Sequence, residues 1–190
     1  IRNGTLDNSS KILLAAAESD DMHLDNETEM LTITQREDLD IETRYENSTV
    51  NIDAQDGFAF VGGEGGLNIN SFTAGGEGRL KVNGDLFNVR IDNNTVFMSN
   101  SAIIEAADGQ IGNSTSVFKI DVADNYSLTA RAMNGMWITE ATNDINVSQL
   151  YSPANINLTS PGRILDALED TVLDVKAQDV TLIANGSIGE

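Results

Sequence analysis

Short segments that alternate apolar and polar residues recur along this chain roughly every ten residues. They span residues 31–34, 39–42, 50–53, 67–70, 80–83, 89–92, 145–148, 156–159 and 180–183. Alternation with a period of two places the apolar side chains on one face of a β-strand. Because the segments repeat at a near-constant interval, we expect each strand to bury its apolar face against copies of itself.

The expected architecture is an all-β parallel β-helix, formed by a single segment that spans residues 1–190 and is a fragment of a larger protein. Two strands per coil give coils of roughly twenty residues, about nine coils, and a stack roughly 45 Å long. The pattern predicts no helix. The nearest candidate, residues 163–170, is short and has strand segments on both sides, which favours a strand or a turn.

Two glycine-rich stretches, residues 62–66 and 75–78, stand out between the strand segments. We expect a loop or a kink at residues 62–78, without a domain boundary. The first stretch is similar to a calcium-binding nonapeptide of the Gly-Gly-x-Gly-x-Asp kind, but Leu67 and Leu80 stand where Ca²⁺ would need a carboxylate. The sequence therefore argues against calcium binding there.

Composition narrows the set of partners. Lys and Arg total 11 and Asp and Glu total 30, so the formal net charge is −19. Such a surface repels nucleic acid and anionic membranes. The chain has no cysteine, which excludes disulfides and thiolate metal sites. Residues 12–17 are apolar but far shorter than the ~18 residues that a membrane helix requires.

Candidate catalytic groups are sparse. Carboxylate pairs suited to general acid and base chemistry occur at Asp20 and Asp21 and at Asp53 and Asp56. The closest mixed cluster contains Arg79, Lys81, Arg90, Asp85 and Asp92. Scattered surface charge explains these residues better than an active site does. We therefore predict no catalytic residue, no cofactor and no metal site.

Two single residues have alternative interpretations. His23 lies between Met22 and Leu24 with no second histidine for a metal site, so we expect an exposed strand residue. Trp137 is the only tryptophan. It could stack on a sugar ring, but a core position is the preferred interpretation.

Asn-x-Ser/Thr sequons are more frequent than this composition produces by chance. They begin at Asn3, Asn8, Asn26, Asn47, Asn93, Asn113, Asn125, Asn146, Asn157 and Asn185. Turns of a solenoid select neighbouring Asn, Ser and Thr because these side chains bond to the backbone, and this is the preferred explanation. N-glycosylation of an exported surface protein is the alternative.

Residues 100–190 resemble the repeat regions of filamentous-haemagglutinin-like and leukotoxin-type large bacterial adhesins. The resemblance rests on the phrases at 107–113 (Ala-Asp-Gly-Gln-Ile-Gly-Asn) and 184–190 (Ala-Asn-Gly-Ser-Ile-Gly-Glu), and on the order of the strand segments between them. It implies a right-handed parallel β-helix on the outside of a bacterium. It supplies no catalytic residues. Residues 1–99 share only the regular spacing of the strand segments.

These observations favour a non-enzymatic structural or adhesive segment of a large, secreted or cell-surface bacterial fibre. The alternative is a carbohydrate-active β-helix enzyme, such as a polysaccharide lyase or a tailspike-type hydrolase. A eukaryotic β-helical ectodomain is a weaker third possibility. Expected partners are neighbouring β-helical coils, further copies of the chain, and host or surface glycans. We expect uncapped strand edges at both ends of the stack.

Overall fold

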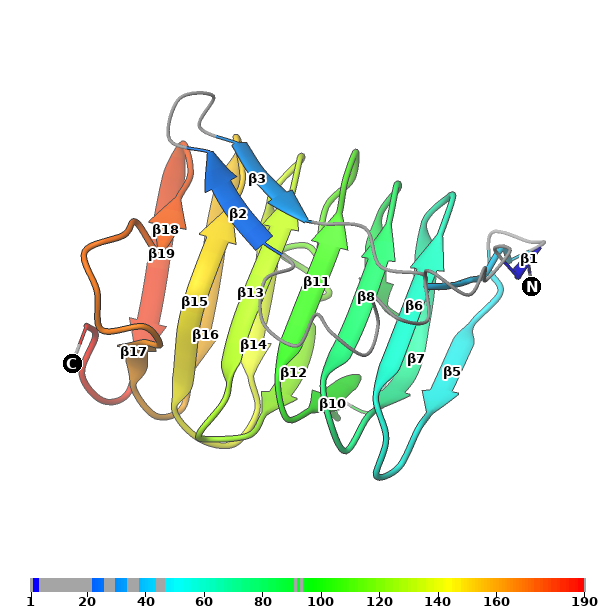
Figure 1. Cartoon of the computed structure of the whole chain (residues 1–190), viewed down its shortest axis with the longest axis horizontal. Helices are drawn as coiled ribbons and strands as arrows, with labels where there is room; N and C mark the ends of the chain where they lie inside the picture. Colours follow the sequence, from blue (N-terminus) through cyan, green and yellow to red (C-terminus); the bar gives the residue numbers. More distant parts are fainter. Residues whose placement is uncertain are drawn as a thin grey trace.

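The computed structural model describes residues 2–3, 22–25, 30–33, 38–43, 47–90, 92 and 94–189. Two long sheets run side by side along the molecule and form the two faces of a β-solenoid of about seven turns (Figure 1). No helix occurs among the described residues, and so none that is long and apolar enough to cross a membrane.

Each coil contributes strands to both sheets. The nine-stranded sheet contains, in spatial order, β1 (Arg2–Asn3), β4 (Leu39–Asp40), β6 (Ala59–Gly63), β8 (Gly78–Val82), β11 (Ala102–Ala106), β13 (Ser127–Ala132), β15 (Ile145–Tyr151) and β17 (Ile164–Asp166), with β18 (Val175–Lys176) also paired to β15. The eight-stranded sheet contains β19 (Asp179–Ala184), β16 (Asn155–Ser160), β14 (Met136–Glu140), β12 (Phe118–Val122), β10 (Phe97–Ser99), β7 (Leu67–Thr73) and β5 (Val50–Asp53), with β9 (Leu86–Asn88) paired to β7.

The strands of successive coils pair in parallel, which confirms the expected parallel β-helix. The coils differ in length. Ala59 pairs with Gly78, whereas Ala102 pairs with Leu128 after a longer stretch of chain. The expectation of about nine coils is therefore wrong, because several coils are longer than the expected repeat and not every strand segment belongs to the stack.

The core lies between the two sheets and consists of the inward side chains of every coil. Alternation along β12 is typical, since Phe118, Ile120 and Val122 are buried while the residues between them are half-buried. An aromatic stack crosses three coils. The Phe72 and Phe97 ring centroids lie 4.3 Å apart, and those of Phe97 and Phe118 lie 6.4 Å apart. Dry, in-register layers of this kind are what stabilises a stacked β architecture.

Two expected strand segments differ from the prediction. Residues 31–33 lie in β3 (Met30–Ile33), which pairs antiparallel with β2 (Met22–Asp25) as a separate hairpin. Alternation specifies a strand with one apolar face but does not specify its partner. In the segment at 89–92, the described residues 89, 90 and 92 do not lie in a strand. β9 ends at Asn88, whose Oδ1 accepts the Arg90 N–H at 2.8 Å, a local turn bond that competes with the ladder.

Residues 62–78 do not form an inserted loop. They contain the end of β6, a corner, all of β7, a second corner and the start of β8, within one regular coil. The candidate helix at 163–170 contains β17, as the strand or turn interpretation predicts.

The two adhesin-like phrases form corners of the coils. Ile111 makes parallel bridges to Leu86 and Met136, where chains enter the eight-stranded sheet, and Ile188 bridges to Ile164 in the nine-stranded sheet. The glycine after each isoleucine has a positive φ, 60° at Gly112 and 91° at Gly189. A β-carbon is unfavourable in this conformation, which explains why the phrase ends in glycine.

The ends of the stack differ from each other. β1 pairs antiparallel with β4, with Arg2 opposite Asp40, and so covers the amino-terminal edge of the nine-stranded sheet. The expectation of an uncapped edge at this end is wrong for that sheet. No strand of the described residues covers β17 or β19 at the opposite end.

Candidate functional site

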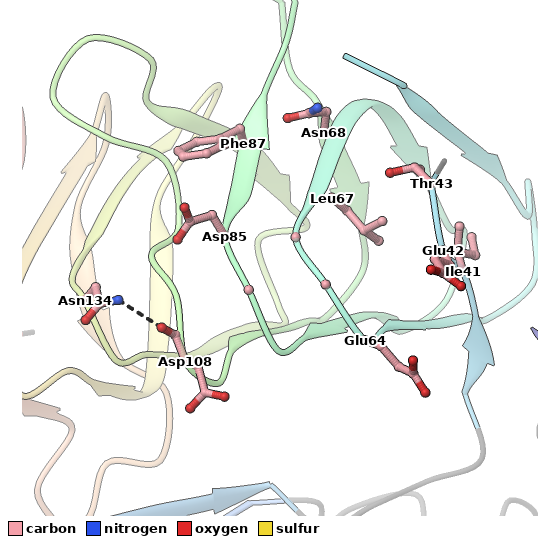
Figure 2. A pocket seen from close by; sticks show the side chains of 13 residues that line it. Ile41, Glu42, Thr43, Glu64, Leu67, Asn68, Asp85, Phe87, Asp108 and Asn134 are labelled. Carbon is pink, nitrogen blue, oxygen red and sulfur yellow. Dashed lines mark hydrogen bonds between the residues drawn. The ribbon is translucent and has the colours of Figure 1, made fainter. Parts of the chain in front are cut away.

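A shallow groove of about 870 Å³ lies along one corner of the coils, and we call it the corner groove. It is lined by Ile41, Glu42, Thr43, Glu64, Gly65, Gly66, Leu67, Asn68, Gly84, Asp85, Phe87, Asp108 and Asn134. Figure 2 shows carboxylates and amides from successive turns arranged along it, with Phe87 beside them. The corner follows β6, β8, β11 and β13 in turn, so each coil contributes lining residues.

Backbone hydrogen bonds between coils form the floor of the corner groove. The Gly84 N–H donates to the Gly65 carbonyl at 3.2 Å, and the Asn134 N–H donates to the Gly109 carbonyl at 2.8 Å. Side chains join the same ladder: Asp85 Oδ1 accepts the Gln110 N–H at 2.9 Å. The Asn134 amide in turn donates to the Asp108 carbonyl at 2.9 Å (Figure 2). These bonds fix the lining residues in register.

The corner groove is electronegative. Four of its lining residues are carboxylates, namely Glu42, Glu64, Asp85 and Asp108, and none is basic. Such a surface repels anionic ligands and suits neutral or cationic ones that exchange hydrogen bonds with amides and carbonyls. Within the described ranges, no group of three or more His, Cys, Asp or Glu side chains is placed to hold a metal ion.

An ion-pair column lies on the outer face of the nine-stranded sheet. Lys81, Glu105 and Arg131 occupy the same register position on three successive coils. Lys81 Nζ lies 3.4 Å from Glu105 Oε2, and Arg131 forms a short ion pair with Glu105 Oε1. Only 3% of the Glu105 side chain is exposed. The column neutralises a carboxylate that would otherwise be buried alone.

The fold separates the five charged residues that lie close together in the sequence, namely Arg79, Lys81, Asp85, Arg90 and Asp92. Arg79 is fully buried, with Nε 3.6 Å from Asp38 Oδ1. Arg90 instead forms a bidentate pair with Asp92 on the surface, and this contact holds the pKa of the Asp92 carboxyl well below its usual range. Asp85 lies in the corner groove. The five residues therefore do not form one site.

Glu105 and Arg131 were missed by the sequence analysis. Both are distant from Lys81 in the sequence, and only the register of three coils of unequal length brings the three residues together. A repeat of fixed length does not align these positions.

Glu140 is a buried carboxyl at the end of β14, 1% exposed. Its Oε1 accepts the Ala141 N–H at 2.8 Å and the Thr142 N–H at 3.3 Å, and its Oε2 accepts the Val122 N–H at 3.2 Å. Burial is the main influence and raises the pKa of Glu140 to about 7, with a further contribution from the negative charge of Asp121. The three N–H donors oppose this rise.

We expect Glu140 to make the protein less stable as pH rises. The unfolded carboxyl ionises near pH 4.5, whereas the folded one keeps its proton until about pH 7. The unfolded state thus binds fewer protons in this window, and the free energy of unfolding falls by on the order of 2–3 kcal/mol between these values. Glu140→Gln should remove this part of the pH dependence, measured by urea unfolding from pH 4.5 to 8.

The matched control is Asp56→Asn, which changes an exposed turn carboxyl and should leave the pH profile of the parent unchanged. If the free energy of unfolding changed with pH in the same way for the parent and for Glu140→Gln, the raised pKa of Glu140 would be contradicted.

The acid and base candidates Asp53 and Asp56 lie apart from both the corner groove and the ion-pair column. Asp53 accepts the Gln55 N–H at 3.1 Å in an exposed turn, and Asp56 is in the same turn. Leu67 and Leu80 are core residues, 2% and 0% exposed, and Leu67 also lines the corner groove. Asp20, Asp21 and residues 12–17 lie outside the described residues.

His23 is in β2, opposite Thr32, as the strand interpretation predicts; its side chain is outside the described part. Trp137 corrects an expectation. It is half-buried between the inward Met136 and Ile138, so its side chain lies on the outer face of the eight-stranded sheet and not in the core.

The sequons occupy several environments. Asn113 Oδ1 accepts the Thr115 N–H at 2.9 Å, the Thr115 hydroxyl at 2.8 Å and the Ser116 N–H at 2.7 Å, which is the turn role proposed for the motif. The Asn146 amide donates to the Tyr126 carbonyl at 3.0 Å within the sheet region.

The remaining sequons divide by exposure. Asn47, Asn125 and Asn185 are exposed, whereas Asn157 is half-buried in β16. Asn3 lies in β1, and its side chain is not described; Asn8, Asn26 and Asn93 lie outside the described residues. N-glycosylation stays a prediction for the exposed asparagines.

Comparisons of this chain with protein-family models, with curated proteins and with solved structures give no match.

Proposed function

We propose that this chain is a non-enzymatic structural and adhesive segment of a large bacterial fibre, secreted or displayed at the cell surface. The observation that carries the proposal is the in-register parallel ladder that runs from β5 to β19 through one sheet and from β4 to β17 through the other. A ladder of this kind resists bending and extends without limit by adding coils. The adhesin-like phrases support the extracellular bacterial setting.

The corner groove supplies the adhesive surface in this proposal. A glycan chain is long, polar and partly apolar, and it can follow a groove that presents one amide or carboxylate per coil and a phenyl ring at Phe87. The four carboxylates favour neutral or amino-bearing glycans over acidic ones. Asp108 and Asn134 take part in the groove through the bond that joins their coils.

The enzyme alternative has one observation in its favour. Lys81, Glu105 and Arg131 are charged residues on three adjacent coils, and a β-helix lyase or hydrolase places its catalytic groups in such a column. However, the column contains one carboxylate, which is paired with both cations and nearly inaccessible. A general acid and base mechanism needs two groups with access to substrate.

The deciding experiment incubates the protein with neutral and acidic polysaccharides and measures both release of oligosaccharides and retention of protein-coated beads on glycan surfaces. We expect no release, and retention on neutral glycans that Phe87→Ala weakens. The matched control is Phe58→Ala, which removes an exposed ring outside the groove. Release of oligosaccharides that Glu105→Gln abolishes would overturn the proposal in favour of an enzyme.

A further inference from the structure

Two aromatic side chains on the outer face of the eight-stranded sheet share one register position. Parallel bridges join Leu86 to Ile111 and Ile111 to Met136 on three successive coils, and all three residues are fully buried. The residues that follow Leu86 and Met136 therefore point outward, which places Phe87 two coils away from Trp137 on the same face. Both rings are half-buried, so each keeps part of its surface open to a ligand.

Gly112 occupies the position between the two rings. Its N–H donates to the Leu86 carbonyl at 2.8 Å, and the Trp137 N–H donates to the Ile111 carbonyl at 2.8 Å, which fixes this register. The φ of Gly112 is 60°, and a β-carbon on it would lie 2.7 Å from the Phe118 nitrogen and 2.8 Å from the Trp137 carbonyl oxygen. The backbone therefore admits no side chain between the two rings.

Uncharged polar side chains continue this register position at both ends. Asn68 is the register partner of Phe87, and Asn157 is the register partner of Trp137. Thr181 follows Asn157 on the next coil. We call these five residues the aromatic column, and none of them is charged. Asn68 and Phe87 also line the corner groove, where Figure 2 shows them on neighbouring strands, so the aromatic column continues that groove along the sheet.

The spacing of the two rings favours one glycan geometry. Two steps of the usual strand spacing separate the Phe87 and Trp137 positions by about 10 Å. In an extended chain of β-1,4-linked hexopyranose units, alternate sugar rings present the same face, and they repeat after one disaccharide, a length close to this spacing. The apolar face of one sugar ring can stack on Phe87 while the ring two units along stacks on Trp137. An α-1,4-linked chain coils, so its alternate rings do not meet both side chains.

We propose that the aromatic column binds an unbranched, neutral, β-1,4-linked glycan that spans Phe87 and Trp137. The proposal rests on the proposed function and names the glycan class for the surface that begins in the corner groove. Asn68 and Asn157 carry amide groups at the two ends, suited to the hydroxyl groups of the sugars. A neutral glycan is favoured because the aromatic column is uncharged and four carboxylates line the adjoining groove.

The first test uses the parent protein, because Trp137 is the only tryptophan and its fluorescence reports on this ring alone. Cello-oligosaccharides and chito-oligosaccharides of increasing length are titrated, with malto-oligosaccharides of the same lengths as the α-linked control. We expect the β-linked chains to shift the emission to shorter wavelength and to reduce quenching by acrylamide. Affinity should rise about tenfold from the disaccharide to the trisaccharide, since the trisaccharide is the shortest chain that reaches both rings. The α-linked chains should leave the emission unchanged.

Variants then separate the two rings. Trp137→Ala and Phe87→Ala should each weaken binding of a β-linked hexasaccharide about tenfold, measured by titration calorimetry, and Trp137→Phe should restore most of the loss. Tyr126→Ala is the matched control and should bind as the parent does, because Tyr126 is 48% exposed and lies outside the aromatic column and the corner groove. The Tm of each variant is compared with that of the parent, and the fluorescence titration of the parent depends on no variant.

Equal affinities for β-linked and α-linked chains would overturn the proposal. So would binding of a neutral glycan that Phe87→Ala weakens but that changes neither the Trp137 emission nor the affinity of Trp137→Ala. The glycan would then lie in the corner groove without reaching Trp137, and the proposed function would be unaffected. Failure of the protein-coated beads to adhere to any neutral glycan surface would overturn the adhesive role in the proposed function, and this proposal with it. Release of oligosaccharides would overturn only the proposed non-enzymatic function.

Discussion

Gly109→Ala should destabilise the protein by about 3 kcal/mol or more, seen as a large fall in Tm and in the urea midpoint. Gly109 is buried at the corner between β11 and the next coil. A β-carbon there would lie 2.6 Å from the backbone nitrogen of Asp85 and closer still to the carbonyl group of Gly84. These neighbours are backbone atoms of the adjacent coil, so the two coils must separate to admit a methyl group.

Gly65→Ala is the matched control, because Gly65 belongs to the same stack of corners but a β-carbon on it would meet no atom within 4 Å. We expect Gly65→Ala to change stability by less than about 1 kcal/mol. Equal effects at Gly65 and Gly109 would show that the corners are not packed as described.

Phe97→Ala should cost about 3–5 kcal/mol, measured by urea unfolding. The Phe97 ring is fully buried and stacks on Phe72, with Phe118 on its other side, so its removal opens a cavity in the centre of three coils. Repacking is limited, since both neighbours are held by strands in fixed register.

The control for this change is the next residue on β10. Met98 is 40% exposed and lies on the opposite face of the strand, so Met98→Ala should cost less than about 1 kcal/mol. A loss at Met98 as large as at Phe97 would reverse the assignment of inward and outward faces.

The inward and outward faces were largely predictable from the sequence, because a period of two leaves little choice. Leu67, Ile69, Ile156 and Leu158 alternate with Asn residues and all four are buried. The turn at Asn113 was equally predictable, since neighbouring Asn, Ser and Thr side chains form hydrogen bonds with the nearby backbone.

Coil length was not predictable in the same way. A corner can absorb extra residues without disturbing the core, so Ala59 and Ala102 reach their partners Gly78 and Leu128 after stretches of chain of unequal length. Contacts that depend on the register between coils could therefore not be predicted from the sequence either. The pairing of Glu105 with Arg131 is the clearest case, because the two residues are distant in sequence and adjacent in the sheet.

Pairing direction was a further limit. An alternating segment fits a parallel coil or an antiparallel hairpin equally well, and the choice depends on what lies beside it. β3 pairs with β2 and β1 pairs with β4, both antiparallel, although the pattern around Leu31 is the same as in the stack.

Cross-linking of paired cysteines tests the parallel β-helix most directly, and the cysteine-free chain gives a clean background. Asn157 and Thr181 are register partners on the outer face of the eight-stranded sheet, whereas Gln149 is on the outer face of the other sheet. A sequential hairpin of the two strands would instead place Gln149 opposite Asn157. We predict that a short bis-maleimide links the pair made by Asn157→Cys and Thr181→Cys, and not the pair made by Gln149→Cys and Asn157→Cys. Efficient linkage of the second pair without the first would contradict the parallel β-helix.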